Sequence, residues 1–139
     1  MLFIHNIFTS EEDMQYLNDY LEKIYWVLCP NSNLYIENKL PRVDLIRRYS
    51  NNIAIGTDSL SSNHKLSVLE EIKTISKAFP SISLEELISW ATINGAKALG
   101  IDDKYGSIEI GKNPGLNLIK SLDLSNLNLT DNSQVEVLQ

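Results

Sequence analysis

Cysteine is almost absent from this chain of 139 residues, which contains only Cys29. One cysteine excludes an internal disulfide framework and any cysteine-rich zinc site, so a reducing compartment is expected. Residues 1–6, MLFIHN, also lack the basic segment and the apolar stretch of a secretory signal. These absences predict a cytoplasmic protein.

Long apolar runs and an excess of positive charge are also missing. The longest strongly apolar runs, such as YWVLC at residues 25–29, are far shorter than the roughly 20 residues needed to cross a bilayer. We therefore expect no membrane-spanning helix and no membrane partner.

The 12 basic residues are outnumbered by 18 acidic ones, for a net charge of −6. Nucleic-acid binders gather basic residues on one face, whereas Arg42, Arg47 and Arg48 are the nearest candidates here, with a solvated helix face as the alternative. No nucleic-acid partner is expected.

The sequence does contain enough apolar residues to form a core. Hydrophobic residues make up 43% of the chain, and its length suits one domain or a piece of one. Short apolar runs predict strands at residues 2–4, 25–28 and 53–55. Apolar residues spaced three and four apart predict helices at 11–24, 43–49, 68–79 and 84–99, with a loop from 29 to about 41. Ser10 with Asp13, and Ser83 with Glu86, are typical of helix N-terminal capping.

The pattern changes after residue 104. Residues 107–110 and 116–119 predict two strands of a hairpin around the turn sequence GKNPG, and residues 135–138 predict a last strand. The chain therefore divides into residues 1–104, with alternating strands and helices, and residues 105–139, a β-hairpin segment.

Three polar segments follow the three strands of the first part. Apolar strands that alternate with helices predict a parallel α/β architecture, in which functional loops lie at the carboxyl ends of the strands. His5, residues 29–33 and Asp58 follow the three strands in turn. We therefore expect them to share one edge of the sheet, although they are far apart in the sequence.

Asp58 and His5 have the side chains best suited to chemistry at this edge. A carboxylate after a strand can bind a metal or accept a proton from a metal-bound water, while a turn or capping aspartate is the alternative. A histidine can act as a general base, a metal ligand or a hydrogen-bond donor near neutral pH. The alternative for His5 is a histidine held by hydrogen bonds at a strand end.

Asn33, His64 and Cys29 are further polar or reactive residues. The amide of Asn33 either braces its loop or contacts a substrate. His64 lies in a polar loop, where a solvated or capping role is expected rather than metal binding. Cys29 is expected to be a small buried hydrophobe rather than a nucleophile, because nothing nearby in the sequence would lower its thiol pKa.

Several segments together resemble a known family. They are FIHN at residues 3–6, LCPNSN at 28–33, GTDS at 56–59 with Ser62-Asn63, and NGAKALG at 94–100. In this order and spacing they resemble the amidohydrolase superfamily, and most closely its chlorohydrolase and aminohydrolase branch, which includes deaminases. GSIEIGK at residues 106–112 is similar to the strand by which these enzymes return from the barrel to a small β-domain.

The resemblance implies a (β/α)₈ barrel that hydrolyses C–N bonds of a small-molecule substrate. A divalent metal, zinc or iron, would lie at the carboxyl mouth of the complete barrel and activate a water. By the motif match, Asp58 is similar to the aspartate after the last strand, which contacts the metal and carries the proton of that water. His5 is similar to the histidine after the sixth strand, which holds the water or the substrate. Asn33 and Ser59 would contact the substrate.

Other metal ligands of this family are missing from the chain. The family has a His-x-His pair after the first strand and a histidine after the fifth, whereas this chain has only His5 and His64. The chain therefore resembles strands six to eight with their helices, followed by part of the β-domain. One hypothesis is the carboxyl-terminal portion of a metal-dependent hydrolase, inactive alone and paired with an amino-terminal part. A second is a non-catalytic module that self-associates or complements a partner, and a third is an unrelated doubly wound binding domain.

Overall fold

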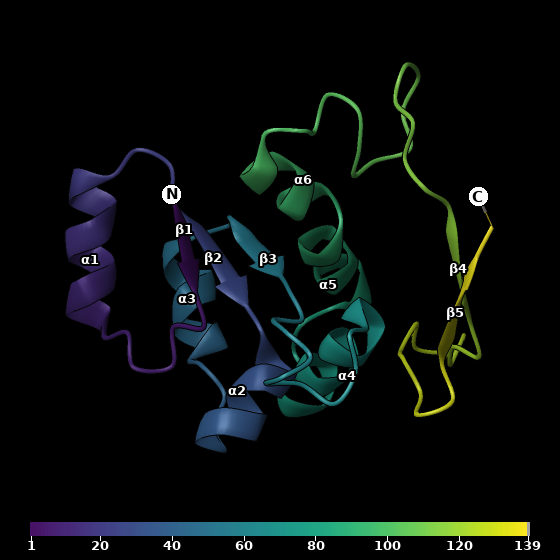
Figure 1. Ribbon diagram of the computed structural model, residues 1–139, viewed down its shortest axis with the longest axis horizontal. Helices are drawn as coiled ribbons and strands as arrows, with labels where there is room; N and C mark the ends of the chain where they lie inside the picture. The colour runs from purple at the N-terminus through teal and green to yellow at the C-terminus, as the bar shows by residue number, and fades with distance from the viewer. Residues whose placement is uncertain (139) are drawn as a thin grey trace.

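A three-stranded sheet surrounded by helices forms the body of the molecule, and a two-stranded sheet lies beside it (Figure 1). The computed structural model describes residues 1–138. The elements are β1 (Leu2–Ile4), α1 (Glu11–Tyr20), β2 (Tyr25–Leu28), α2 (Pro30–Glu37), α3 (Val43–Tyr49), β3 (Ile53–Ile55), α4 (Val68–Ala78), α5 (Leu84–Ala91), α6 (Ile93–Leu99), β4 (Asn117–Lys120) and β5 (Gln134–Val137).

The sheet of the body is parallel, with strand order β1-β2-β3. Ile4 is paired with Val27, and Val27 with Ala54, so the three strands end almost level with one another. All three strands predicted from the sequence are confirmed, with the predicted bounds. Their carboxyl ends bring three loops to one edge of the sheet, and these loops carry the polar residues described below.

One face of the sheet packs against the helices. Trp26, Leu28 and Ile53 point to this face and form a buried cluster with Leu45 and Leu87 from the helices. Burial of apolar side chains of this size is the main source of folding free energy.

The other face is covered at β3 but open at β1. Ala54 is buried, whereas 42% of Leu2 and 52% of Ile4 is exposed. β1 is therefore not covered on both faces, although the strands of a parallel α/β sheet usually are. Sequence could not show this, because an apolar strand has the same pattern whether or not a helix covers it.

Three predicted helical boundaries are also corrected. The segment after Cys29 is not a loop throughout, because Pro30 occupies the first turn of α2, where a missing N–H costs nothing. The helix that begins at Glu11 ends at Tyr20, four residues earlier than expected. The predicted helix at 84–99 is broken at Thr92, whose hydroxyl donates to the Ile88 carbonyl (2.7 Å). Such a bond competes with the regular helical ladder.

The hairpin predicted for residues 107–119 is wrong. β4 pairs antiparallel with β5, as Ile119 opposite Val135 shows. Residues 107–110 form no strand; Lys112 instead donates hydrogen bonds to Ser107 and Glu109, which closes this stretch into a turn. The last predicted strand is confirmed as β5.

Within residues 1–138, no helix combines the length and the apolar character that crossing a membrane requires.

Candidate functional site

His5 follows β1 directly and Asp58 follows β3 after Gly56 and Thr57, both in backbone conformations that L-residues rarely adopt. The φ angle is 73° at His5 and 58° at Asp58. Left-handed conformations of non-glycine residues are costly and are concentrated at functional sites. Both side chains lie beside the first turn of α2, which follows the central strand β2.

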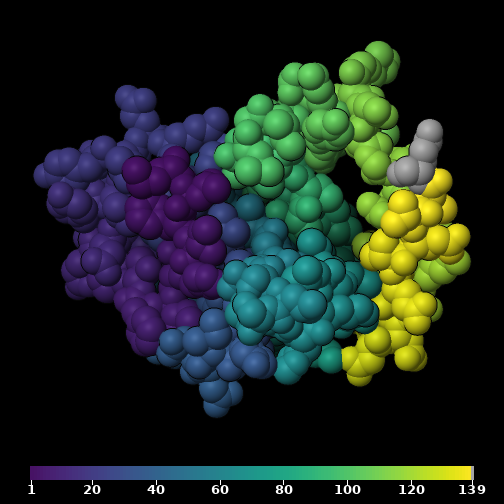
Figure 2. Space-filling model, viewed as in Figure 1, coloured from purple at the N-terminus to yellow at the C-terminus, as the bar shows by residue number. Residues whose placement is uncertain are grey.

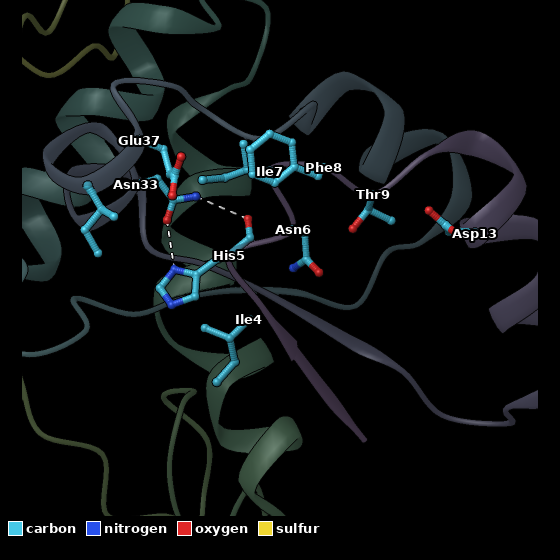
Figure 3. A pocket seen from close by; sticks show the side chains of 10 residues that line it. Ile4, His5, Asn6, Ile7, Phe8, Thr9, Asp13, Asn33 and Glu37 are labelled. Carbon is cyan, nitrogen blue, oxygen red and sulfur yellow. Dashed lines mark hydrogen bonds between the residues drawn. The ribbon is translucent and has the colours of Figure 1, made fainter.

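His5 is held by Asn33 through two hydrogen bonds (Figure 3). The Asn33 amide nitrogen donates to the backbone carbonyl of His5 (3.3 Å), so its Oδ1 faces the ring nitrogen Nδ1 at 2.9 Å. Because Oδ1 can only accept, Nδ1 carries the proton and Nε2 is an acceptor in the neutral ring. Asn33 is 1% exposed, and it therefore fixes both the position and the tautomer of His5.

A hollow of about 480 Å³ lies beside His5. The loop after β1, with Phe8 and Asn6, forms one wall, and Ile36 and Glu37 of α2 form another. His5 and Asn33 therefore line a concave part of the surface, whereas Asp58 lies outside it.

Asp58 is held by two serine hydroxyls. Ser32 of α2 and Ser62 of its own loop both donate to Oδ2, at 2.8 and 2.9 Å. Hydrogen bonds to a carboxylate favour its charged form, and these two, first Ser32 and then Ser62, lower the pKa of Asp58 below its ordinary value of 3.8. Asp58 is therefore an ionised acceptor at neutral pH.

With the His5 ring neutral, two hydrogen-bond acceptors face each other at the edge of the sheet. His5 Nε2 lies 3.7 Å from Asp58 Oδ2, and 41% and 32% of the two side chains is exposed. At this separation a donor such as water can bond to both atoms at once. The structure therefore brings together the two residues that the sequence singled out.

The chain supplies only part of a metal site. Within residues 1–138, no group of three or more histidine, cysteine, aspartate or glutamate side chains is placed to hold a metal ion. His5 and Asp58 are two donors, whereas a catalytic zinc site takes three protein ligands.

Glu71 is a buried carboxylate behind this edge that sequence reasoning missed. It is 0% exposed and accepts hydrogen bonds from the backbone N–H of Asn31 (2.8 Å) and from the amide of Asn63 (2.7 Å). Burial raises the pKa of Glu71 above 4.5, and the hydrogen bonds from Asn31 and Asn63 oppose this shift. A signal existed in the sequence, because Glu71 precedes Ile75 by four residues and so lies on the buried face of α4.

The other candidate residues lie around this edge. Ser59 is exposed, and its hydroxyl contacts Ser61 at 2.7 Å. Cys29 is 2% exposed, and burial, followed by the nearby charges of Asp58 and Glu71, raises the pKa of its thiol to about 11. This agrees with the expected buried, unreactive cysteine. His64 packs edge-on against Tyr35 of α2.

The fold and the site define a class of protein: an α/β protein with its functional residues at the carboxyl edge of a parallel sheet. The family is more specific. The model of the amidohydrolase family matches residues 1–138, and the chain therefore belongs to this family, as the motifs indicated.

Curated relatives and solved structures agree with this assignment. A 5-methylthioadenosine/S-adenosylhomocysteine deaminase of Thermoanaerobacter pseudethanolicus is 38% identical over 122 residues, which are 83% of this chain and 28% of the relative. The aminofutalosine deaminase structure of Helicobacter pylori superposes with a TM-score of 0.72 at 30% identity, over 82% of this chain and 29% of that one. An adenosine deaminase structure from Xanthomonas campestris with bound zinc has a TM-score of 0.69 at 31% identity, over 80% and 26% of the two chains. The chain thus spans less than a third of the length of these relatives.

Proposed function

We propose that this chain supplies the His5–Asp58 side of the active site of a deaminase-type amidohydrolase. The observation that carries the proposal is the pair of acceptors, His5 Nε2 and Asp58 Oδ2, held 3.7 Å apart at the carboxyl edge of the sheet. The similar deaminases act on adenosine-type compounds, so the substrate class is a small molecule with an amino group on a purine ring.

The residues fit one part of a metal centre. Asp58, ionised and one-third exposed, would be one ligand of a divalent metal, zinc or iron. A bound metal lowers the pKa of water and so supplies a nucleophile at neutral pH. The remaining ligands would come from an amino-terminal part of the barrel, so this chain alone would be inactive.

Asp58 and His5 have distinct roles in the proposed reaction. Hydrolytic deamination forms a bond between water oxygen and a ring carbon, breaks the C–N bond and releases ammonia. Asp58 accepts the proton of the attacking water and returns it to the leaving amine. His5, with its proton on Nδ1, presents Nε2 to the same water. Asn33 acts through His5, and the exposed Ser59 is the proposed substrate contact.

The open part of the sheet gives the missing portion a place to bind. β1 is an edge strand with exposed Leu2 and Ile4, and exposed edges of this kind favour strand addition. In this proposal β1, β2 and β3 are strands six to eight of a (β/α)₈ barrel in a cytoplasmic enzyme. The same exposed strand favours the second candidate function, a non-catalytic module that self-associates or binds a partner.

A chimera tests the first proposal. The matching segment of the Thermoanaerobacter deaminase is replaced by residues 1–138, and ammonia release from 5-methylthioadenosine is measured together with zinc content. We expect an active chimera that loses at least about 100-fold in kcat on Asp58→Ala, since removal of a proton-transfer group costs this much. Asp19→Ala, which removes an exposed carboxylate near the end of α1, is the matched control.

Two outcomes separate the candidate functions. A folded, zinc-loaded chimera that releases no ammonia would contradict the enzymatic proposal. Sedimentation of residues 1–138 alone as a stable dimer would then favour the non-catalytic module, whereas a monomer at high concentration would count against it.

A further inference from the structure

We infer that Glu71 is the positioning residue that sets the separation of His5 and Asp58, by anchoring the first turn of α2 and the loop after β3. This inference rests on the proposed function for its consequence in catalysis. It concerns a buried carboxylate on α4 that contacts neither His5 nor Asp58 and therefore acts only through other residues.

Glu71 is linked by hydrogen bonds to two segments, and each link is called an arm here. The first arm runs from Glu71 to α2. The N-cap of this helix is Cys29, whose side chain makes no capping hydrogen bond. Glu71 Oε2 takes over this role from another helix, because it accepts from the Asn31 N–H at 2.8 Å. A carboxylate at a helix N-terminus satisfies an orphan donor and interacts favourably with the helix dipole.

The anchored turn of α2 carries both residues that hold the site. Ser32 donates to Asp58 Oδ2, and Asn33 bonds to His5. Thr74, one turn beyond Glu71 on α4, donates to the side chain of Asn31 (2.6 Å) and ties the same turn to the same helix. A shift of this turn would therefore displace both partners of the acceptor pair.

The second arm runs from Glu71 to the loop after β3. Glu71 Oε1 accepts from the Asn63 amide nitrogen, which also donates to the Thr57 carbonyl, both at 2.7 Å. Asn63 thus closes the loop that contains Asp58 and Ser62 and links it to α4. Since Glu71 is 0% exposed, no water can replace these bonds without rearrangement.

The two arms need a carboxylate and not an amide. Both oxygens of Glu71 accept from donors, so a glutamine at this position would turn its NH₂ group toward one of them. Glu71→Gln keeps the shape of the side chain and breaks one arm. Glu70→Gln is the matched control, because Glu70 is adjacent in the sequence but pairs with Lys73 and Lys65 instead.

Nuclear magnetic resonance on the chain alone tests the inference without requiring activity. We expect Glu71→Gln to accelerate amide hydrogen exchange at Asn33 or Ser62, according to which arm breaks, by about tenfold or more through local opening. Loss of the Asn31 arm would also move the ¹⁵N signals of the neutral His5 ring from the single Nδ1–H form to a mixture of tautomers. Glu70→Gln should leave both unchanged. A folded Glu71→Gln chain with unchanged exchange and tautomer would overturn the inference.

Asn63→Ala provides a second variant in case Glu71→Gln does not fold. It removes the arm to the loop and keeps the arm to α2, so we expect faster exchange at Ser62 alone. Equal acceleration at Asn33 and Ser62, or none at either, would contradict two separate arms.

The chimera adds a catalytic readout. There we expect Glu71→Gln to lower kcat by roughly tenfold or more with little change in KM, since small displacements of reacting groups are costly. A change in KM alone would overturn the positioning role. An inactive wild-type chimera would defeat the proposed function and leave the resonance experiments to decide on Glu71.

Discussion

The body of the molecule, residues 1–104, and the segment after it differ most in how much they bury. Leu28, Leu45 and Leu87 of the body are fully buried, whereas all four residues of β5 are exposed. Figure 2 shows the carboxyl-terminal residues as a strip along one side of the body. The comparison shows that apolar residues contribute to a core only where another element covers them, because burial of apolar surface drives folding.

The largest expected effect breaks the core of the body. Leu87→Ala removes a fully buried side chain of α5 and should lower the free energy of unfolding by about 4 kcal/mol through lost burial and a cavity. Val137→Ala in the exposed β5 should change it by about 0.5 kcal/mol or less. Urea denaturation of both variants measures the difference, and equal losses would mean that the two regions are packed alike.

A smaller effect is expected where the body passes into the carboxyl-terminal segment. Gly106 has a φ of 91°, and a Cβ there would lie 2.8 Å from Ala96 Cβ and 2.9 Å from Ile93 Cα. Gly106→Ala should therefore cost about 3 kcal/mol, from backbone strain and overpacking together.

Gly111 provides the matched control for this glycine. Its φ is 90°, but no atom lies within 4 Å of the added Cβ. Gly111→Ala should therefore lower the free energy of unfolding only through backbone strain, by about 1 kcal/mol. Thermal unfolding of the two variants separates these terms. Equal costs would show that residues 105–115 do not rest on α6.

The third prediction concerns a local motif of the body. Ser10 caps α1 by accepting from the Asp13 N–H (3.1 Å), and Asp13 accepts in return from Ser10. Ser10→Ala should cost about 1 kcal/mol of stability, as expected for loss of a helix cap.

The same motif predicts a pH dependence. Hydrogen bonds from the backbone and side chain of Ser10 hold the pKa of Asp13 below its ordinary 3.8. The stability from this shift is present above about pH 4 and is lost as the pH falls through the lower, folded-state pKa. Asp13→Asn should therefore reduce the loss of unfolding free energy below about pH 4, measured as stability against pH. Glu12→Gln, which lies outside the capping box, serves as the control. An unaltered loss at acid pH in Asp13→Asn would exclude the capping box as its source.

The smallest expected effect concerns the ion pair between the two regions. Lys77 of α4 pairs with Asp131 in the loop before β5. Both side chains are exposed, so Lys77→Ala should cost about 0.5 kcal/mol or less, and the difference should vanish in high salt. If Lys77→Ala instead lowers the free energy of unfolding strongly and independently of salt, the carboxyl-terminal segment is bound to the body more firmly than its exposure indicates.

Local patterns in the sequence predicted much of the fold. The three strands of the body, the cap at Ser10 and the end of α6 at Gly100 each depend on a few neighbouring residues. The strand predicted at residues 107–110 shows the limit of such patterns. Residues 107–110 have the alternation of a strand, but within residues 1–138 they have no strand to pair with, and a strand without a partner is not stable.

The candidate site divides in the same way. His5 and Asp58 could be placed at one edge from strand order and motif, because parallel strands end at the same side of a sheet. Their separation of 3.7 Å could not, since it depends on Asn33, Ser32 and Ser62.

The sequence by itself determined the three strands of the body, most of its helices, the family to which the chain belongs and the residues that lie at the carboxyl edge. These properties follow from short-range spacing and from motifs of a few residues. Only the tertiary structure decided that β1 is open on one face, that β4 pairs with β5 and that Glu71 on α4 bonds both to α2 and to the loop after β3. The physical reason is that burial and hydrogen bonding join residues 40 or more positions apart, as from Asn31 to Glu71, and no local pattern records which partner a side chain will meet.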